Sequence, residues 1–379
     1  MANDKDFIVK NAVEVGKDTK VTLGTISSSA INLSTGNYFN DTLTANTTYT
    51  INNAGAVQSF QLEVTGVTLY TNNWDVSAAS YSQNFSVASQ ETNPTGIFFK
   101  PDGTEMYIIG IAGDDVNQYT LSTAWDISTA SYTRNFSVAS EDLGPTGVFF
   151  KTDGTKMYVA GLVGTDINEY TLSTAWNIST ASYSQNLSVS TPDGGIEGMY
   201  FRTDGLKMYY AGRYSDGIYE YTLSTAWDIS TASYIQNHSV SSQDGNIRGV
   251  FFKSDGTKMY VVGDDGNDVN EYTLSTAWDV STASYSQNFS VSSQDTEPQD
   301  IFFKPEGDKM YIVGDVGNDI NEYTVGSFAD ATITWPSSIE WGSGTAPSAP
   351  AGGETDLFSF STDDGGTTYH GFKTADNLS

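Results

Sequence analysis

Residues 94–140 read PTGIFFKPDGTEMYIIGIAGDDVNQYTLSTAWDISTASYTRNFSVAS, and this stretch decides the fold because it returns along the chain. An internal repeat has to be recognised before any single motif is interpreted. Its tryptophans keep a constant step of 51 residues and stand at Trp74, Trp125, Trp176, Trp227 and Trp278. No insertion or deletion breaks this phase, so the chain contains several copies of one structural unit.

Each copy contains four short apolar or alternating runs separated by turn residues. In residues 94–140 these runs are 96–100, 105–110, 116–121 and 130–138. Gly-, Asp- and Asn-rich segments between such runs indicate antiparallel strands joined by tight turns. Four strands in a repeat of this length predict one blade of a β-propeller, with the first two strands buried between neighbouring blades.

The count of strands predicts how the ring closes. The first three strands occur five times, beginning near residues 96, 147, 198, 249 and 300. The fourth strand also occurs five times, but its first copy, residues 79–87, precedes every other strand of the repeat. The last set, 299–324, has no fourth strand after it. We therefore expect residues 79–87 to complete the last blade of a closed, all-β, five-bladed propeller without exposed edges.

The pattern PxG…F…DGTKMYV…VNEYTL resembles the repeats of YVTN- and NHL-type β-propellers. This resemblance concerns the repeats only, and it implies a fold without implying an activity.

The segments on either side of the repeats have a different pattern. Alternating strand-like runs occupy residues 28–66 and resume after residue 327. Neither half has enough strands for a core of its own, whereas together they make about eight. We therefore predict a small β-sandwich, residues 28–66 and 327–379, into which a propeller of residues 67–326 is inserted. Residues 1–27 precede it as an attachment segment.

These flanking segments carry a second resemblance. VQSFQLEVTG (57–66) and ATITWPSSIEWGSGTAPSAPAGGETDLFSFSTDDGGTTYHGF (331–372) are similar to a domain found in marine phage fibres and other virion proteins. DKDFIVKNAVEVG (4–16) is similar to the attachment strands of cyanophage-type tail fibres. The resemblance implies a virion structural protein, made in the host cytoplasm, that forms homotrimers and contacts other virion proteins through residues 1–27.

Composition excludes several classes of function. The formal net charge is −29, with only 17 Lys and Arg residues, which disfavours nucleic acid and anionic lipid as partners. The chain has no cysteine and shows no apolar stretch of membrane-spanning length. We expect neither nucleic-acid binding nor membrane insertion.

The acidic residues of the repeats gather on one face of the predicted ring. The loops before the first strand and after the second supply eighteen carboxylates, whereas only Arg213 and Arg248 oppose them there. Seven of these acids are candidate ligand-binding residues: Glu91, Asp115, Asp166, Asp244, Asp268, Asp295 and Asp319.

Three interpretations of this acidic face remain open. The acids are either turn-forming residues of a solvated surface, or Ca²⁺ ligands, or catalytic carboxylates. The segment GDDGNDVN (263–270) offers Asp264, Asp265 and Asp268 as Ca²⁺ ligands. Catalysis requires one asymmetric constellation, whereas these acids recur from blade to blade. We therefore expect no enzymatic activity and no cofactor other than Ca²⁺.

The repeated tryptophans have two interpretations. In the structural one, an Asx turn follows each indole, and the indole covers the outer core of its blade. In the functional one, Trp125, Trp176, Trp227 and Trp278 form peripheral platforms on which sugar rings stack.

The function expected from these observations is that of a fibre-type display protein of a bacteriophage, whose repeated blades bind host-surface glycan through several weak sites. The alternative is a capsid or tail spacer that binds no host ligand. A glycan-degrading enzyme is the third hypothesis.

Overall fold

The computed structural model describes residues 26–27, 29–55 and 58–378. The chain forms two compact units, one of residues 72–327 and one of residues 1–71 together with 328–379. The proposed attachment segment, residues 1–27, lies outside the described residues except for Ile26 and Ser27. In the described part of the chain, no helix is long and apolar enough to cross a membrane.

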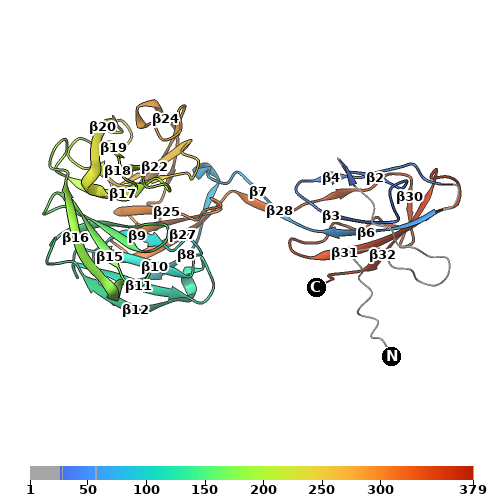
Figure 1. Ribbon diagram of the computed structural model, residues 1–379, viewed down its shortest axis with the longest axis horizontal. Coiled ribbons are helices and arrows are strands. Elements are labelled where there is room, and N and C mark those ends of the chain that lie inside the picture. The colour runs from blue at the N-terminus through green and yellow to red at the C-terminus, as the bar shows by residue number, and fades with distance from the viewer. Residues whose placement is uncertain (1–25, 28, 56–57, 379) are drawn as a thin grey trace. The chain divides into compact units, whose positions relative to one another are not determined.

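The larger unit is a five-bladed β-propeller, as the repeat predicts (Figure 1). Each blade is a four-stranded antiparallel sheet, and we name its strands A to D from the axis outward. Blade I consists of β9 (Pro94–Phe99), β10 (Glu105–Gly110), β11 (Asp115–Leu121) and β12 (Ala130–Ser137). Blade II consists of β13 (Pro145–Phe150), β14 (Lys156–Gly161), β15 (Asp166–Leu172) and β16 (Ala181–Ser188). Blade III consists of β17 (Ile196–Phe201), β18 (Lys207–Gly212), β19 (Gly217–Leu223) and β20 (Ala232–Ser239).

The last two blades confirm the predicted closure. Blade IV consists of β21 (Ile247–Phe252), β22 (Lys258–Gly263), β23 (Asp268–Leu274) and β24 (Ala283–Ser290). Blade V consists of β25 (Pro298–Phe303), β26 (Lys309–Gly314), β27 (Asp319–Val325) and β8 (Ala79–Ser86). Strand β8 pairs with β27 in a register that runs from Val325↔Ala79 to Asp319↔Ser86. The N-terminal strand therefore completes the C-terminal blade, and the ring has no open edge there.

Burial follows strand position within each blade. Strands A, B and C are buried almost throughout, because neighbouring blades cover both of their faces, whereas strand D alternates and has mostly exposed side chains. A short 3₁₀ helix precedes strand D in every blade; it joins strand C to strand D in blades I to IV, and in blade V it leads into β8. These helices are η2 (Val76–Ala78), η3 (Ile127–Thr129), η4 (Ile178–Thr180), η5 (Ile229–Thr231) and η6 (Val280–Thr282). An Asp or Asn caps each of them and accepts a backbone N–H two residues later, as the Asx turn predicts.

The smaller unit is built from both ends of the chain. Its main sheet is mixed and has the order β3 (Tyr38–Thr42), β6 (Gln58–Thr65), β31 (Thr355–Thr362), β32 (Tyr369–Ala375) and β30 (Ile339–Trp341). Two smaller sheets consist of β1 (Ile26–Ser27), β2 (Ala30–Asn32) and β5 (Thr50–Asn52), and of β4 (Thr47–Thr48) and β29 (Ile333–Thr334). Apolar residues from all of these sheets share one core.

Pairing between β6 and β31 unites the two halves of this unit. The register runs from Thr355↔Thr65 to Thr362↔Gln58, and Phe60 stacks on Phe360 with ring centroids 4.7 Å apart. Strands β7 (Thr68–Thr71) and β28 (Ser327–Asp330) pair where the chain passes from one unit to the other and back. The first boundary between the units follows Thr71, five residues later than the sequence placed it.

Candidate binding site along the propeller axis

The repeated tryptophans are wedges between blades. Trp227 is only 6% exposed, and its indole packs on Phe201 of its own blade and on Tyr158 of the preceding one. It also covers Gly205, where an added Cβ would lie 2.4 Å from the indole. The Asp-Gly turn therefore needs glycine for close approach as well as for its positive φ.

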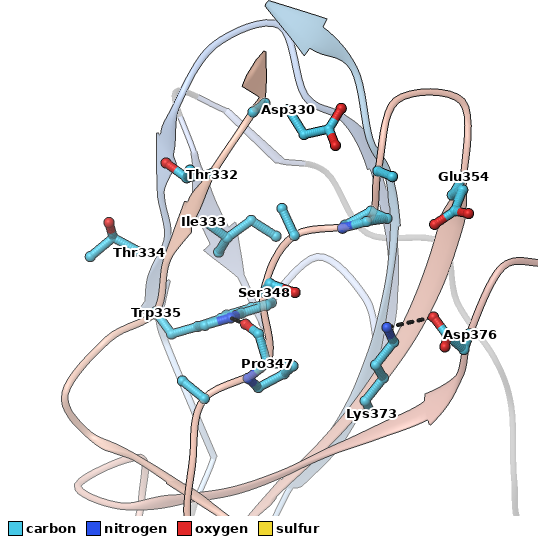
Figure 2. Close-up of a pocket in the computed structure, with 15 residues that line it drawn as sticks. Asp330, Thr332, Ile333, Thr334, Trp335, Pro347, Ser348, Glu354, Lys373 and Asp376 are labelled. Atoms are coloured by element: carbon cyan, nitrogen blue, oxygen red, sulfur yellow. Dashed lines mark hydrogen bonds and ion pairs between the residues drawn. The ribbon is translucent and has the colours of Figure 1, made fainter. Parts of the chain in front are cut away.

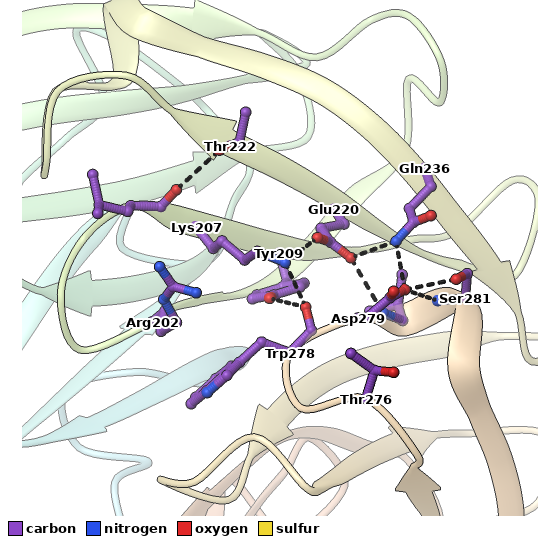
Figure 3. A network of polar contacts seen from close by, with 12 residues as sticks. Arg202, Lys207, Tyr209, Glu220, Thr222, Gln236, Thr276, Trp278, Asp279 and Ser281 are labelled. Carbon is purple, nitrogen blue, oxygen red and sulfur yellow. Dashed lines mark hydrogen bonds and ion pairs between the residues drawn. The ribbon is translucent and has the colours of Figure 1, made fainter.

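The backbone of each tryptophan joins two blades. Trp278 donates its N–H to the Gly256 carbonyl at 3.0 Å, and its own carbonyl accepts from Tyr209 Oη and Lys207 Nζ of blade III, both at 2.8 Å. Lys207 also pairs with the buried Glu220. Figure 3 shows Tyr209 and Lys207 reaching the Trp278 carbonyl, with Glu220 beside Lys207. We call this Trp–Tyr–Lys–Glu arrangement the inter-blade clasp.

The clasp corrects one interpretation of the sequence. The indoles reach inward, toward strand A and the A–B turn, and do not cover the outer part of the blade. Trp125 and Trp227 are buried, whereas Trp176 and Trp278 are half-buried and stack on Phe150 and Phe252, so the indoles are engaged by protein rings rather than presented to a sugar.

Blade I carries a variant clasp. Lysine is replaced by Glu105 and glutamate by Gln118, whose Nε2 donates to Glu105 at 2.6 Å and to the Trp176 carbonyl at 3.2 Å. Tyr107 Oη donates to the same carbonyl at 2.7 Å. Arg134 occupies the position of a glutamine in the other blades and donates to Asn177, the residue that replaces aspartate there.

The acids of the D–A loops bind backbone amides. Glu91 accepts from the N–H groups of Asn93 at 2.8 Å and of Ala112 and Gly113 at 3.1 Å. Asp244 and Asp295 accept in the same way from their own loop and from the B–C turn. Burial raises the pKa of Glu91 and of Asp244, and the backbone N–H groups oppose that effect. These carboxylates hold two loops together.

The acids that open strand C bind asparagine side chains. Asp166 accepts from Asn168 Nδ2 at 2.7 Å and from Asn186 Nδ2 at 2.6 Å. Asp115, Asp268 and Asp319 repeat this pattern, and all four aspartates are 7% exposed. The asparagines that precede Phe-Ser or Leu-Ser in strand D therefore have a structural partner.

The acidic face is consequently far less exposed than the sequence suggests. Eleven of the eighteen loop carboxylates are buried, among them all seven that we considered as ligand-binding residues. The carboxylate oxygens of these seven residues accept hydrogen bonds from protein donors, so they have little remaining capacity to bind a ligand.

The three aspartates proposed as Ca²⁺ ligands do not share one site. Asp264 pairs with Arg248 at 2.7 Å, Asp268 is held by asparagines, and Asp265 is exposed. Across residues 26–27, 29–55 and 58–378, no three acidic or histidine side chains converge as a metal site requires.

The blades differ from one another along the axis. Three inner positions of strand A vary, and their five copies read Thr95-Gly96/Phe98, Thr146-Gly147/Phe149, Glu197-Gly198/Tyr200, Arg248-Gly249/Phe251 and Gln299-Asp300/Phe302. We overlooked this asymmetry in the sequence, although the columns PTG, PTG, IEG, IRG and PQD display it.

The first of these positions lines a polar mouth at the loop end of the axis. The mouth has a volume of about 140 Å³ and is lined by Asn93, Thr95, Ile111, Thr146, Leu162, Glu197, Arg213, Arg248, Glu297, Gln299 and Asp315. Glu197 accepts from Arg248 at 3.0 Å and from Arg213 at 3.4 Å. Burial raises the pKa of Glu197, and both arginines oppose this; burial and the neighbouring Glu297 raise the pKa of Asp315.

The second position forms a narrow ring of glycines that Asp300 interrupts. A Cβ on Gly198 would lie 2.9 Å from the Gly249 Cα, and one on Gly249 would lie 2.6 Å from Asp300 Oδ1. The Asp300 carboxylate accepts from the N–H groups of Ile97 at 3.0 Å and Ile301 at 2.8 Å. Burial raises its pKa to about 7, although the two backbone N–H groups oppose that effect.

The third position forms an aromatic cup at the opposite end of the axis. The cup has a volume of about 310 Å³. Its wall consists of Phe98, Phe149, Tyr200, Phe251 and Phe302 together with flanking aromatic residues, and its rim consists of Pro101, Thr152, Thr203, Ser254 and Pro305 from the A–B turns. Asp300 lines neither cavity, so its position in strand A places it between them.

The smaller unit has a wide hollow of about 890 Å³ beside β29 (Figure 2). Its charged lining residues are already engaged: Lys373 pairs with Asp376 at 2.6 Å and with the buried Asp356 at 2.7 Å. Trp335 Nε1 donates to the Pro347 carbonyl at 2.8 Å. We therefore regard the propeller axis as the stronger candidate site.

The sequence matches no protein-family model, and no curated protein matches it. Solved structures similar to it include a putative 6-phosphogluconolactonase from Bacteroides fragilis, at 16% identity and a TM-score of 0.37 over 52% of this chain and 55% of that one. Another putative 6-phosphogluconolactonase, from Bacteroides uniformis, has 13% identity and a TM-score of 0.40 over 60% and 67%. The β-propeller domain of Cps50 (Swd1) from Myceliophteria thermophila has 10% identity and a TM-score of 0.41 over 65% and 99%.

The chain spans about half the length of the first of these structures. Likenesses at this level carry no argument about activity.

Proposed function

We propose that the chain is a non-enzymatic structural protein of a bacteriophage particle, and that its propeller recognises a host-surface glycan through the polar mouth. The observation that carries the glycan part is the mouth itself, where the blades stop repeating and charged and amide groups of Glu197, Arg213, Arg248, Glu297 and Gln299 converge. The virion part is supported by the resemblance of the flanking segments.

The chemistry of the mouth suits a single sugar unit. Its volume of about 140 Å³ is of the order of one hexose ring, and its walls alternate donors and acceptors, which sugar hydroxyls require. Each chain then has one such site and not five, because the seven repeated acids are buried and the repeated indoles are stacked on inner aromatic rings. Avidity would come from several chains in a homotrimer attached to other virion proteins through residues 1–27.

The arrangement favours binding over hydrolysis. Glycoside hydrolysis needs one protonated acid opposite a free carboxylate. Glu197 is bound by two arginines, and Asp300, whose pKa is about 7, lies outside the lining of the mouth. Asp315 and Glu297 do line the mouth, but their side chains are in hydrogen-bond contact with each other, too close to lie on opposite sides of a glycosidic bond.

A glycan array with the full-length chain tests the recognition. We expect at least one bacterial surface polysaccharide to bind, with a loss of tenfold or more in Arg213→Ala. The matched control is Lys151→Ala, which removes a cation from the opposite face of the ring and should leave the signal unchanged. A blank array, or equal binding by both variants, would favour the alternative of a spacer protein.

Mass spectrometry and antibody labelling of purified phage particles test the location. The proposal requires the chain in intact particles, at a copy number divisible by three. Its absence from them would refute the virion part, whatever the array shows.

A further inference from the structure

The aromatic cup has a closed wall of five rings, one from each strand A. Neighbouring ring centroids lie 5.0 to 5.5 Å apart around the whole cycle, and each pair meets edge to face at 65° to 74°. Such geometry is the favoured arrangement for aromatic pairs, so the five rings support one another. The cup opens between the A–B turns and is separated from the polar mouth by Asp300 and the glycine ring.

One residue of this wall departs from the others. Four copies carry phenylalanine, whereas blade III carries Tyr200. Tyr200 is 7% exposed and lines the cup, and no described residue forms a hydrogen bond with its hydroxyl. The hydroxyl itself is not sealed inside the protein, so it reaches the open space of the cup, where a ligand can meet it. Burial also raises the pKa of Tyr200, which keeps the hydroxyl protonated and able to donate.

We propose that the cup binds a small uncharged aromatic molecule that carries one hydrogen-bond acceptor oxygen, such as an aryl ketone, and that Tyr200 Oη donates to this oxygen. The volume of about 310 Å³ accommodates a two-ring compound. The site lies at the opposite end of the axis from the glycan mouth and does not depend on the function proposed above.

Charge argues for a neutral ligand. The five-ring wall consists of carbon apart from the Tyr200 hydroxyl, and the other polar side chains of the lining, Trp74, Trp125, Thr152, Thr203 and Ser254, are uncharged. An ion would therefore lose its hydration without gaining a partner of opposite charge. The basic residues just behind the rim are already paired, Lys151 with Asp153 at 2.8 Å and Lys253 with Asp255 at 2.7 Å. The rim therefore offers no free cation for an acidic ligand.

The test compares two probes of nearly equal size with the full-length protein. 2-Acetylnaphthalene carries the acceptor oxygen, and 2-ethylnaphthalene lacks it. Titrations followed by ligand-observed NMR should give a dissociation constant for the ketone at least fivefold lower than for the hydrocarbon. Glycan binding should not change when either probe is present.

Two conservative variants locate the effect. Tyr200→Phe installs the residue of the other four blades and should fold; it should remove the preference for the ketone and keep the affinity for 2-ethylnaphthalene within twofold. Tyr234→Phe removes an exposed hydroxyl on strand D of the same blade and should change neither affinity. The proposal is overturned if neither probe binds, or if the preference for the ketone persists in Tyr200→Phe.

Discussion

The inter-blade clasp and the axis follow opposite rules within one set of repeats. Four of the five clasps use the same tryptophan, tyrosine, lysine and glutamate. In each, the tyrosine and the lysine donate to the tryptophan carbonyl of the neighbouring blade. Along the axis only blades I and II present the same inner residues. Side chains that face a cavity have fewer partners to satisfy, so they are the ones that differ. In this protein, repetition marks the frame and variation marks the candidate site.

Removing an indole should have the largest effect on the frame. Trp227→Ala deletes a buried ring that separates blades II and III, and such substitutions cost about 3–5 kcal/mol of unfolding free energy. Guanidinium denaturation measures it, with the exposed Tyr183→Ala as the control. If Trp227→Ala lowers the unfolding free energy by less than about 1 kcal/mol, the structural role of the indole is contradicted and the interpretation as a surface sugar platform is favoured.

Asp300, on the propeller axis, should make the unfolding free energy of the protein depend on pH. The pKa of Asp300 is about 7 in the folded chain and lies near its ordinary value of 3.8 in the unfolded one, so the folded state binds the proton more tightly. This preference stabilises the fold fully below about pH 4 and is lost as the pH rises through 7.

Asp300→Asn removes this dependence. The unfolding free energy of the native protein minus that of the variant should fall by about 4 kcal/mol between pH 4 and pH 8. Thermal or chemical denaturation across this range measures the difference, and other titrating groups cancel because both chains share them. A pH-independent difference would show that the carboxylate is not sealed in the axis.

Breaking the ionic part of one clasp should cost less than removing its indole. Lys207→Met leaves the buried Glu220 without its cation, which we expect to cost about 2 kcal/mol. Lys151→Met breaks an exposed pair with Asp153 and should cost less than about 0.5 kcal/mol. Equal costs for the two substitutions would mean that the clasp lysine is an ordinary surface cation.

The architecture could be predicted from the sequence because it depends on spacing. The constant step of 51 residues gave the blade, and the surplus strand at 79–87 gave the closure that β8 and β27 make. The Asx turns before the 3₁₀ helices were also predictable, since their hydrogen bonds span two residues. Each of these features is local or periodic.

The roles of the acids could not be predicted, since they depend on contacts between distant loops. Asp295 looks like a surface carboxylate until its acceptance of the Gly317 N–H, 22 residues later, is known. The inward direction of the indoles depends on a positive φ at tryptophan, which no propensity predicts. The asymmetry of the axis was visible in the aligned copies, but we gave weight to the residues that recur and too little to those that differ.

The variant clasp of blade I offers the finest comparison between frame and variation. Glu105 and Gln118 replace the lysine and glutamate of the other blades, so an ion pair becomes a carboxylate–amide pair with one negative charge, while the contacts to the Trp176 carbonyl are kept. Glu105→Lys alone loses the acceptor for Gln118, and Gln118→Glu alone places a second carboxylate beside Glu105. Each single substitution should cost about 1 kcal/mol.

The double variant Glu105→Lys/Gln118→Glu restores the pair of the other four blades. A double-mutant cycle by chemical denaturation should therefore give a favourable interaction of about 1–2 kcal/mol between the two positions. Additive effects, within about 0.5 kcal/mol, would mean that these two residues vary independently. The clasp residues would then vary as freely as the residues along the axis. Repetition between blades would no longer distinguish residues that stabilise the propeller from residues of the candidate site.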